Sequence, residues 1–185
     1  MLALDLCCGS GGWTDGFLAA GFRVTGVDIV PQPDYQGEFI LGDVRLLDGH
    51  LFKGYDVIVA SPPCQEFSRW RMPWLRHLRR EPDLSIIKGC WRIRAEAQPK
   101  FFILENVREA QRWLGPATVA REPYYLWGDV FLVSPPRRVK KESISGARPD
   151  LRSRIPFDMA FGIALTLRGT LEKYARIADG DGGLR

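Results

Sequence analysis

The first 28 residues constrain the fold most, because two short apolar runs flank a glycine-rich turn and a helical segment. Residues 2–7 and 22–27 are apolar stretches of strand length. Between them, a glycine-rich turn precedes a helix that we expect to begin near Trp13, with Ser10 or Thr14 as its cap, and to end at Gly21. This order predicts a βαβ unit and hence a mainly parallel sheet.

Acidic residues in and after these strands favour a nucleoside ligand. Asp28 ends the second strand, where a carboxylate accepts hydrogen bonds from ribose hydroxyls. Asp5 lies inside an apolar strand, which is costly unless a partner satisfies it. The turn lacks the lysine of a phosphate-binding loop. An amino-acid-bearing nucleoside without phosphates, such as S-adenosylmethionine, suits this loop better than a dinucleotide.

A third predicted strand, residues 39–44, also ends in an acid. Asp43 could accept a hydrogen bond from the amino group of an adenine. It could equally cap a helical turn over residues 44–47. Both roles remain open from the sequence.

A cysteine and a glutamate each follow an apolar run of strand length. Residues 57–60 predict a buried strand that Pro62 and Pro63 must end, which places Cys64 just beyond its carboxyl end. Residues 101–104 form another such run, and Glu105 follows it. A buried structural thiol and a helix-capping carboxylate are the simpler interpretations. If the two strands are neighbours, thiol and carboxyl share one crevice, an arrangement suited to covalent catalysis with acid assistance.

A basic stretch adjoins the cysteine. Residues 69–80 hold several arginines and two tryptophans without an acid. The whole chain carries a formal charge of +4 and a pI near 9.0. Such a stretch is often a solvated surface, but guanidinium groups and indoles together favour nucleic-acid contact.

The remainder of the chain predicts one domain. We expect a helix over residues 84–97, one or two strands within residues 124–133, and a sheet-packing helix over residues 154–171. With 185 residues, the chain predicts a single catalytic domain over residues 1–178 and a flexible tail over residues 179–185.

Composition narrows the setting. We expect no membrane contact, because no segment is apolar over the length of a membrane span and no signal peptide is visible. The four cysteines include no C-x-x-C pair, so we expect neither a metal site nor disulfides, and a reducing, cytoplasmic location.

Three ordered motifs together resemble those of the C5-cytosine DNA methyltransferases. Residues 5–13, D-L-C-C-G-S-G-G-W, are similar to that family's D-L-F-A-G-x-G-G-F cofactor loop. Residues 63–68, P-C-Q-E-F-S, resemble its P-C-Q-x-F-S loop, and residues 105–107 match its E-N-V motif. Residues 135–139, P-P-R-R-V, are only partly like its Q-x-R-x-R motif. The resemblance implies a Rossmann-like methyltransferase fold with helices on both faces of the sheet.

The resemblance also implies roles for individual residues. The catalytic residues would be Cys64, Glu105 and Arg138. The contacts to S-adenosylmethionine, which leaves as S-adenosylhomocysteine, would be Asp5, Cys7, Gly9, Gly11, Gly12, Trp13, Asp28, Ile29, Asp43, Val44 and Pro63. The contacts to the nucleic acid would be Gln65, Ser68, Arg69, Arg71, Asn106, Val107 and Arg137.

The implied reaction is methyl transfer to C5 of a cytosine flipped out of DNA, through a covalent bond between Cys64 and C6. Arg69 or Arg71 would favour the thiolate. The chain departs from the family in having Cys7 where an aromatic ring stacks on adenine. It also has only residues 140–154 where the family inserts a target-recognition domain. A separate partner would then have to supply specificity. The alternatives to a DNA cytosine methyltransferase are an RNA cytosine methyltransferase, an amino-methyltransferase and a binding module without turnover.

Overall fold

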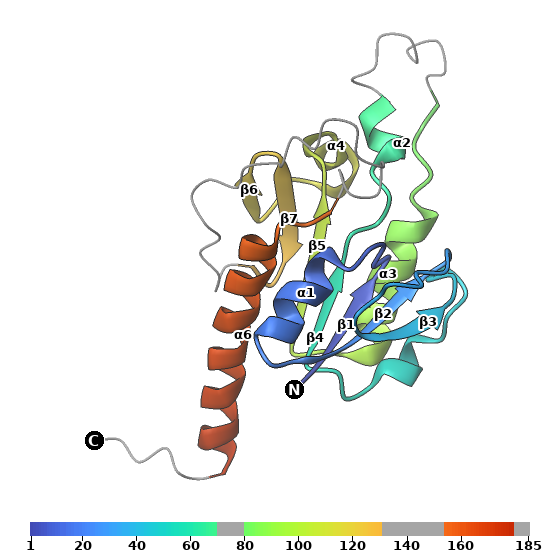
Figure 1. Cartoon of the computed structure of the whole chain (residues 1–185). Helices are drawn as coiled ribbons and strands as arrows, with labels where there is room; N and C mark the ends of the chain where they lie inside the picture. The colour runs from blue at the N-terminus through green and yellow to red at the C-terminus, as the bar shows by residue number, and fades with distance from the viewer. Residues whose placement is uncertain (70–79, 131–153, 180–185) are drawn as a thin grey trace.

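A seven-stranded sheet forms the centre of the computed structural model, which describes residues 1–69, 80–130 and 154–179 (Figure 1). The strands in chain order are β1 (Leu2–Leu6), β2 (Arg23–Asp28), β3 (Glu38–Leu41), β4 (Val57–Ala60), β5 (Phe101–Asn106), β6 (Val119–Arg121) and β7 (Tyr124–Gly128). Their order across the sheet is β3-β2-β1-β4-β5-β7-β6. The first five run parallel, and β7 and β6 are antiparallel at one edge. The predicted mainly parallel α/β sheet is confirmed.

Helices cover both faces of the sheet. Helices α1 (Gly12–Ala19) and α6 (Phe157–Ala178) lie side by side on one face, and α3 (Ser85–Ala97) covers the other (Figure 1). The two helices of the first face cross closely because Gly16 has no side chain. A Cβ there would lie 2.5 Å from that of Ala160. Strands covered on both faces have two apolar sides, which explains their unbroken hydrophobic runs.

Several boundaries differ from the predictions. Helix α1 is capped by Gly11 in the left-handed conformation (φ 81°) and not by Ser10 or Thr14. The Thr14 hydroxyl donates to the buried Asp5 instead, a stronger demand than capping. Strand β3 stops at Leu41, so Asp43 and Val44 belong to the turn after it. Strand β5 continues through Asn106 because β7 pairs with its last residues.

The ends of the chain also differ in detail. Helix α6 continues to Ala178, seven residues beyond the predicted end at Leu171, and residues 180–185 lie outside the described part. Strand β7 accounts for the start of the stretch 124–133, and β6 was not predicted. The other short elements, also not predicted, are the 3-10 helices η1 (Gly49–Phe52) and η4 (Arg108–Ala110) and the helices α2 (Gln65–Ser68) and α4 (Gln111–Leu114). Over the described residues, every helix is too short or too polar to cross a membrane.

Candidate active site

The glycine-rich loop after β1 is built on left-handed backbone. Cys7, Gly9 and Gly11 have φ values of 57°, 47° and 81°, so the chain turns sharply between strand and helix. The Cys8 amide donates to the Val27 carbonyl (3.1 Å), which holds the loop against the end of β2. A Cβ on Gly9 would have nothing within 4 Å. The backbone of this loop is therefore open to a ligand.

Asp28 fixes the glycine-rich loop from the end of β2. Its Oδ2 accepts from the Gly9 amide (2.9 Å), and its Oδ1 accepts from the Val30 amide (2.9 Å). The side chain of Ile29, which lies between Asp28 and Val30 in the sequence, is 60% exposed. An exposed apolar side chain beside a carboxylate is a suitable edge for a nucleoside.

Asp5 lies beneath this loop and is 1% exposed. Its Oδ2 accepts from the Thr14 hydroxyl (2.8 Å), whereas its Oδ1 has no hydrogen-bond partner in the described structure. Burial raises the pKa of this carboxyl from 3.8 to about 7. Thr14 also hydrogen-bonds the Tyr35 hydroxyl, and the tyrosine ring packs against Gly11 and Gly26. Tyr35 was not predicted, because nothing in the local sequence of the β2–β3 connection relates it to β1.

The Asp43 turn lies beside Asp28. Strands β2 and β3 pair Asp28 with Leu41, and the Gly42 amide donates to the Asp28 carbonyl (2.9 Å). The Asp43 carboxylate accepts from the Arg45 amide (2.9 Å) and from its guanidinium (2.5 Å). The guanidinium holds the pKa of Asp43 below its usual value. Asp43 thus caps its own turn, as one of its two interpretations predicted, and its contact to adenine stays a prediction.

Trp13 is buried in the protein interior, and Cys7 is partly buried with its thiol at α3. The Cys7 thiol is hydrogen-bonded to Cys90 of α3, and this contact together with burial raises its pKa. The Trp13 side chain is 2% exposed, and its indole donates to the Ser61 hydroxyl (2.8 Å). Trp13 therefore ties the start of α1 to the end of β4. The contacts of these two residues to a ligand stay predictions.

The segment before α6 packs on the glycine-rich loop, which was not predicted. Arg154 forms an ion pair with Asp15 and donates to the Gly11 carbonyl (3.5 Å). A Cβ on Gly12 would lie 2.6 Å from the Ile155 amide nitrogen. This contact joins residues more than 140 positions apart, so no local sequence signal reveals it.

Cys64 and Glu105 come from neighbouring strands. Strands β4 and β5 pair Ala60 with Leu104, so the loop after β4 and the last residues of β5 lie at the same edge of the sheet. Glu105 was predicted to follow its strand but lies within β5, because β7 pairs with it. The buried Asn106 amide nitrogen donates to the Pro62 carbonyl (2.9 Å), and its oxygen accepts from the Val107 amide (2.9 Å). The loop that carries Cys64 is thus fastened to the strand that carries Glu105.

Around Cys64, the predicted nucleic-acid contacts occupy different settings. Gln65 is exposed, as is the predicted cofactor contact Pro63, whereas Ser68, Arg69 and the predicted nucleophile Cys64 are partly buried. The Arg69 guanidinium is paired with Glu66, which also accepts from Arg80 (3.0 Å) and from the Asp83 amide (3.0 Å). The predicted nucleic-acid contacts Arg71 and Arg137 and the predicted catalytic residue Arg138 lie outside the described residues.

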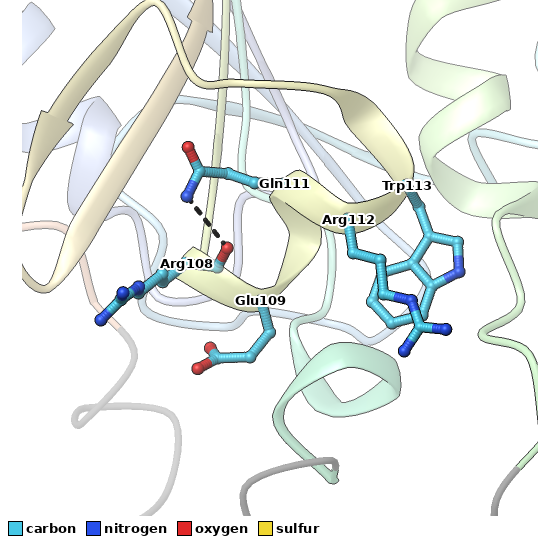
Figure 2. Close-up of a pocket in the computed structure, with 5 residues that line it drawn as sticks. All are labelled: Arg108, Glu109, Gln111, Arg112 and Trp113. Atoms are coloured by element: carbon cyan, nitrogen blue, oxygen red, sulfur yellow. Dashed lines mark hydrogen bonds between the residues drawn. The ribbon is translucent and has the colours of Figure 1, made fainter.

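A pocket of about 320 Å³ lies just after Val107, over η4 and α4 (Figure 2). Its lining residues are Arg108, Glu109, Gln111, Arg112 and Trp113. The Arg112 guanidinium lies 5.2 Å from the centre of the Trp113 ring, and that ring also contacts Phe67 of α2. The pocket therefore adjoins both the E-N-V motif and the helix after Cys64. No sequence pattern predicted it.

The fold and the glycine-rich loop define a class, the α/β methyltransferases of the S-adenosylmethionine-dependent type. Within that class, a family model described as C-5 cytosine-specific DNA methylase matches residues 1–112. The chain belongs to this family, which confirms the resemblance seen in the sequence motifs.

Individual relatives match the same part of the chain. The type II methyltransferase M.NgoMIV of Neisseria gonorrhoeae is 32% identical over 57% of this chain and 35% of its own length. M1.HphI of Haemophilus parahaemolyticus is 34% identical over 56% of this chain and 32% of its own. The chain thus spans about a third of these relatives. A crystal structure described as a DNA modification methyltransferase encoded within an Escherichia coli prophage is 26% identical over 62% of this chain and 34% of its own, with a TM-score of 0.47.

Proposed function

We propose that this protein transfers a methyl group from S-adenosylmethionine to C5 of cytosine in DNA, through a covalent bond between Cys64 and C6. The observation that carries the proposal is the hydrogen bond between Asn106 and Pro62 (2.9 Å). It fastens the loop of the candidate nucleophile to the strand of the candidate acid. Family membership supports the same reaction.

The residues around the glycine-rich loop fit the cofactor. The open face of Gly9 accommodates close approach of a ligand to the backbone. Asp28 receives two backbone N–H groups, which leaves carboxylate lone pairs for ribose hydroxyls. Ile29 and the Asp43 turn would border the adenine. When bound, S-adenosylmethionine supplies an electrophilic methyl group.

The chain's own residues would activate the cytosine. The Cys64 thiolate adds to C6, which breaks the C5–C6 double bond and makes C5 nucleophilic. Glu105 donates a hydrogen bond to N3 and stabilises the negative charge that develops on the ring during addition. After C5 has gained the methyl group, water takes up the C5 proton. The electron pair of that C–H bond re-forms the C5–C6 double bond, and the C6–S bond breaks to release the thiolate. The nucleophile is thereby regenerated.

We propose DNA, and not RNA, as the substrate. Family membership favours DNA over RNA. Because only residues 140–154 stand where the family inserts a target-recognition domain, we propose that a separate specificity partner contributes to target recognition. Equal methylation of matched DNA and RNA duplexes by the chain alone would contradict the preference for DNA.

Covalent trapping tests the chemistry. DNA with 5-fluorocytosine lacks the C5 proton, so the adduct formed after methyl transfer cannot eliminate. We expect a denaturation-resistant complex with the wild-type protein and cofactor, and none with Cys64→Ser. Methylation of ordinary DNA without trapping would indicate an amino-methyltransferase. Cofactor binding with neither product would indicate a binding module.

A further inference from the structure

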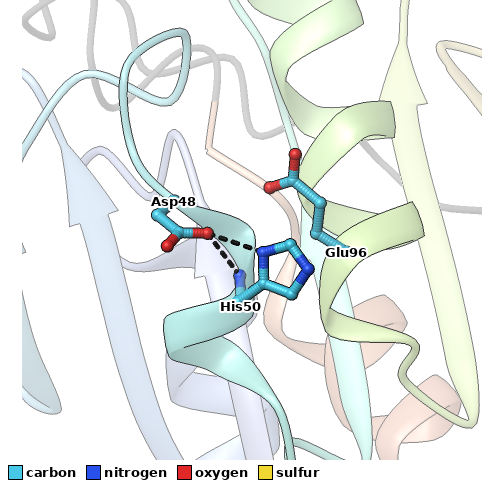
Figure 3. Close-up of side chains that lie close together, drawn as sticks. All are labelled: Asp48, His50 and Glu96. Carbon is cyan, nitrogen blue, oxygen red and sulfur yellow. Dashed lines mark hydrogen bonds and ion pairs between the residues drawn. The ribbon is translucent and has the colours of Figure 1, made fainter.

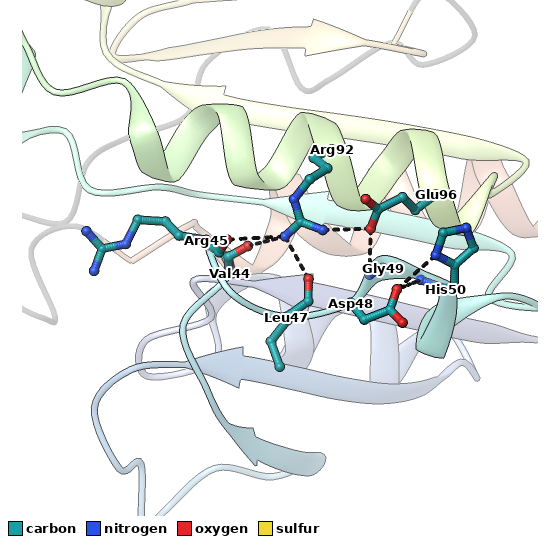
Figure 4. A network of polar contacts seen from close by, with 8 residues as sticks. All are labelled: Val44, Arg45, Leu47, Asp48, Gly49, His50, Arg92 and Glu96. Carbon is teal, nitrogen blue, oxygen red and sulfur yellow. Dashed lines mark hydrogen bonds and ion pairs between the residues drawn. The ribbon is translucent and has the colours of Figure 1, made fainter.

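Arg92 of α3 donates hydrogen bonds to several backbone carbonyls of the turn that follows β3 (Figure 4). Its Nη2 donates to the Leu47 carbonyl (2.6 Å), to the Val44 carbonyl (3.1 Å) and, more weakly, to the Arg45 carbonyl (3.4 Å). Its Nη1 donates to Glu96 Oε2 (2.6 Å), one helical turn further along α3. One guanidinium therefore holds three carbonyls of a segment that has no regular partner strand.

Glu96 fixes this guanidinium and holds the next residues of the connection. Its Oε2 also accepts from the Gly49 amide (2.7 Å). Asp48 and His50 lie beside it and are hydrogen-bonded to each other (2.8 Å), so the three side chains form a compact group (Figure 3). Arg92 already neutralises Glu96, and its positive charge opposes a cation there. We therefore assign the group to the Arg92 network and not to a metal.

Gly89 provides a second, independent contact between α3 and the same turn. A Cβ at this position would lie 2.8 Å from the Val44 carbonyl oxygen and 3.2 Å from the Arg45 Cα. The helix can approach the turn this closely only without a side chain. Gly89 and Arg92 lie three residues apart and thus on the same side of α3.

The turn held in this way carries Asp43, the candidate adenine contact. The Asp43 carbonyl accepts from the Leu46 amide (2.9 Å) and from the Leu47 amide (3.1 Å). The Leu47 carbonyl in turn accepts from Arg92. A shift of Leu47 would therefore move the backbone of Asp43.

We propose that Arg92 is a positioning residue, which keeps Asp43 oriented to accept a hydrogen bond from the 6-amino group of the cofactor's adenine. This inference rests on the proposed cofactor. It assigns to α3, on the face of the sheet opposite α1, a part in the recognition of the base. A contact that only stabilises the fold would affect all ligands equally.

The test compares two ligands that differ in one amino group. Calorimetry would measure the affinity for S-adenosylhomocysteine and for its analogue with unsubstituted purine in place of adenine. We expect the wild type to prefer the adenine form by about tenfold, the size of one well-made hydrogen bond. Arg92→Met should abolish most of this preference and leave the affinity for the analogue nearly unchanged.

Arg168 of α6 provides the matched control. It also donates to a backbone carbonyl, that of Ala20 (2.8 Å), and to a glutamate four residues on, Glu172 (2.8 Å). Arg168→Met should retain the wild-type preference for adenine. If Arg92→Met does not fold, Gly89→Ala disturbs the turn through the independent contact and should reduce the preference in the same way.

The outcomes separate the inference from the proposed function. Equal preference in the wild type and in a folded Arg92→Met protein would overturn the inference. So would an equal loss of affinity for both ligands. Failure of the wild-type protein to bind S-adenosylhomocysteine would instead contradict the proposed cofactor.

Discussion

Replacement of Asn106 by alanine should weaken both the fold and the chemistry. The side chain is 1% exposed and makes two hydrogen bonds of 2.9 Å, to the Pro62 carbonyl and from the Val107 amide. A buried polar group that loses its partner costs about 1–3 kcal/mol. Because Val107 is only half-buried, its amide can recover a bond to water. The Pro62 carbonyl is then the one group left without a partner, so we expect a loss of about 1–3 kcal/mol in the free energy of unfolding, or about 2–12 °C in Tm.

The chemical effect should exceed the effect on stability. Without Asn106, the Pro62 carbonyl no longer anchors the loop that carries Cys64, and small displacements of a nucleophile are costly. The rate of covalent trapping by 5-fluorocytosine DNA should fall by about tenfold or more under conditions where the variant is fully folded. Circular dichroism melting and timed gel assays provide the two measurements.

Gln111→Ala is the matched control for this prediction. The Gln111 amide also bridges two backbone groups, the Arg108 carbonyl (3.3 Å) and the Ala117 amide (3.1 Å), but it does not contact the Cys64 loop. It should trap DNA at close to the wild-type rate. An Asn106→Ala protein that is folded and traps as fast as Gln111→Ala would refute the proposed role of Asn106.

Three further perturbations test other parts of the site. Burial raises the pKa of Asp5 from 3.8 to about 7, so between these values the folded protein holds a proton that the unfolded chain has released. The free energy of unfolding should then fall by up to about 4 kcal/mol as pH rises through this window. Urea titrations of Asp5→Asn should show no such dependence, and pH profiles of stability that run parallel for the wild type and Asp5→Asn would contradict the raised pKa of Asp5. Gly9→Ala and Gly54→Ala both place a side chain in left-handed backbone with open space around it, so each should cost about 1–2 kcal/mol of stability. Only Gly9→Ala should also weaken binding of S-adenosylhomocysteine in calorimetry, and equal binding by both variants would argue against the cofactor loop. Glu66→Gln should release the guanidinium groups of Arg69 and Arg80 near Cys64. The slope of log affinity for DNA against log salt concentration should then steepen by up to about one unit per added phosphate contact, whereas Glu172→Gln on α6 should leave it unchanged. A slope unchanged by Glu66→Gln would exclude these two arginines from the interface.

Local sequence patterns predicted the strands well but not what joins them. The apolar runs at 2–7, 57–60 and 101–104 correspond to β1, β4 and β5, because strands buried on both faces need continuous apolar residues. The prediction that Ser10 or Thr14 caps α1 was wrong, since Gly11 occupies the cap position. The demand of a buried Asp5 for the Thr14 hydroxyl outweighed the local preference for capping.

Contacts between distant segments had no sequence signal. The packing of Tyr35 on Gly26, the ion pair between Arg154 and Asp15, and the reach of Arg92 to Leu47 each join separate elements. Each depends on the tertiary arrangement, since arginine and tyrosine are common surface residues elsewhere. The position of Asp43 illustrates the same limit. The sequence predicted that Asp43 lies at the end of a strand, but it could not reveal that Arg92 of α3 holds the turn in which Asp43 lies.

The most direct test of the account is peptide mapping of the protein after reaction with 5-fluorocytosine DNA and S-adenosylmethionine. We predict a single modified peptide in which the methylated, fluorinated nucleotide is attached to the sulfur of Cys64. Attachment at Cys7, Cys8 or Cys90, or methylated DNA without any protein adduct, would contradict the account.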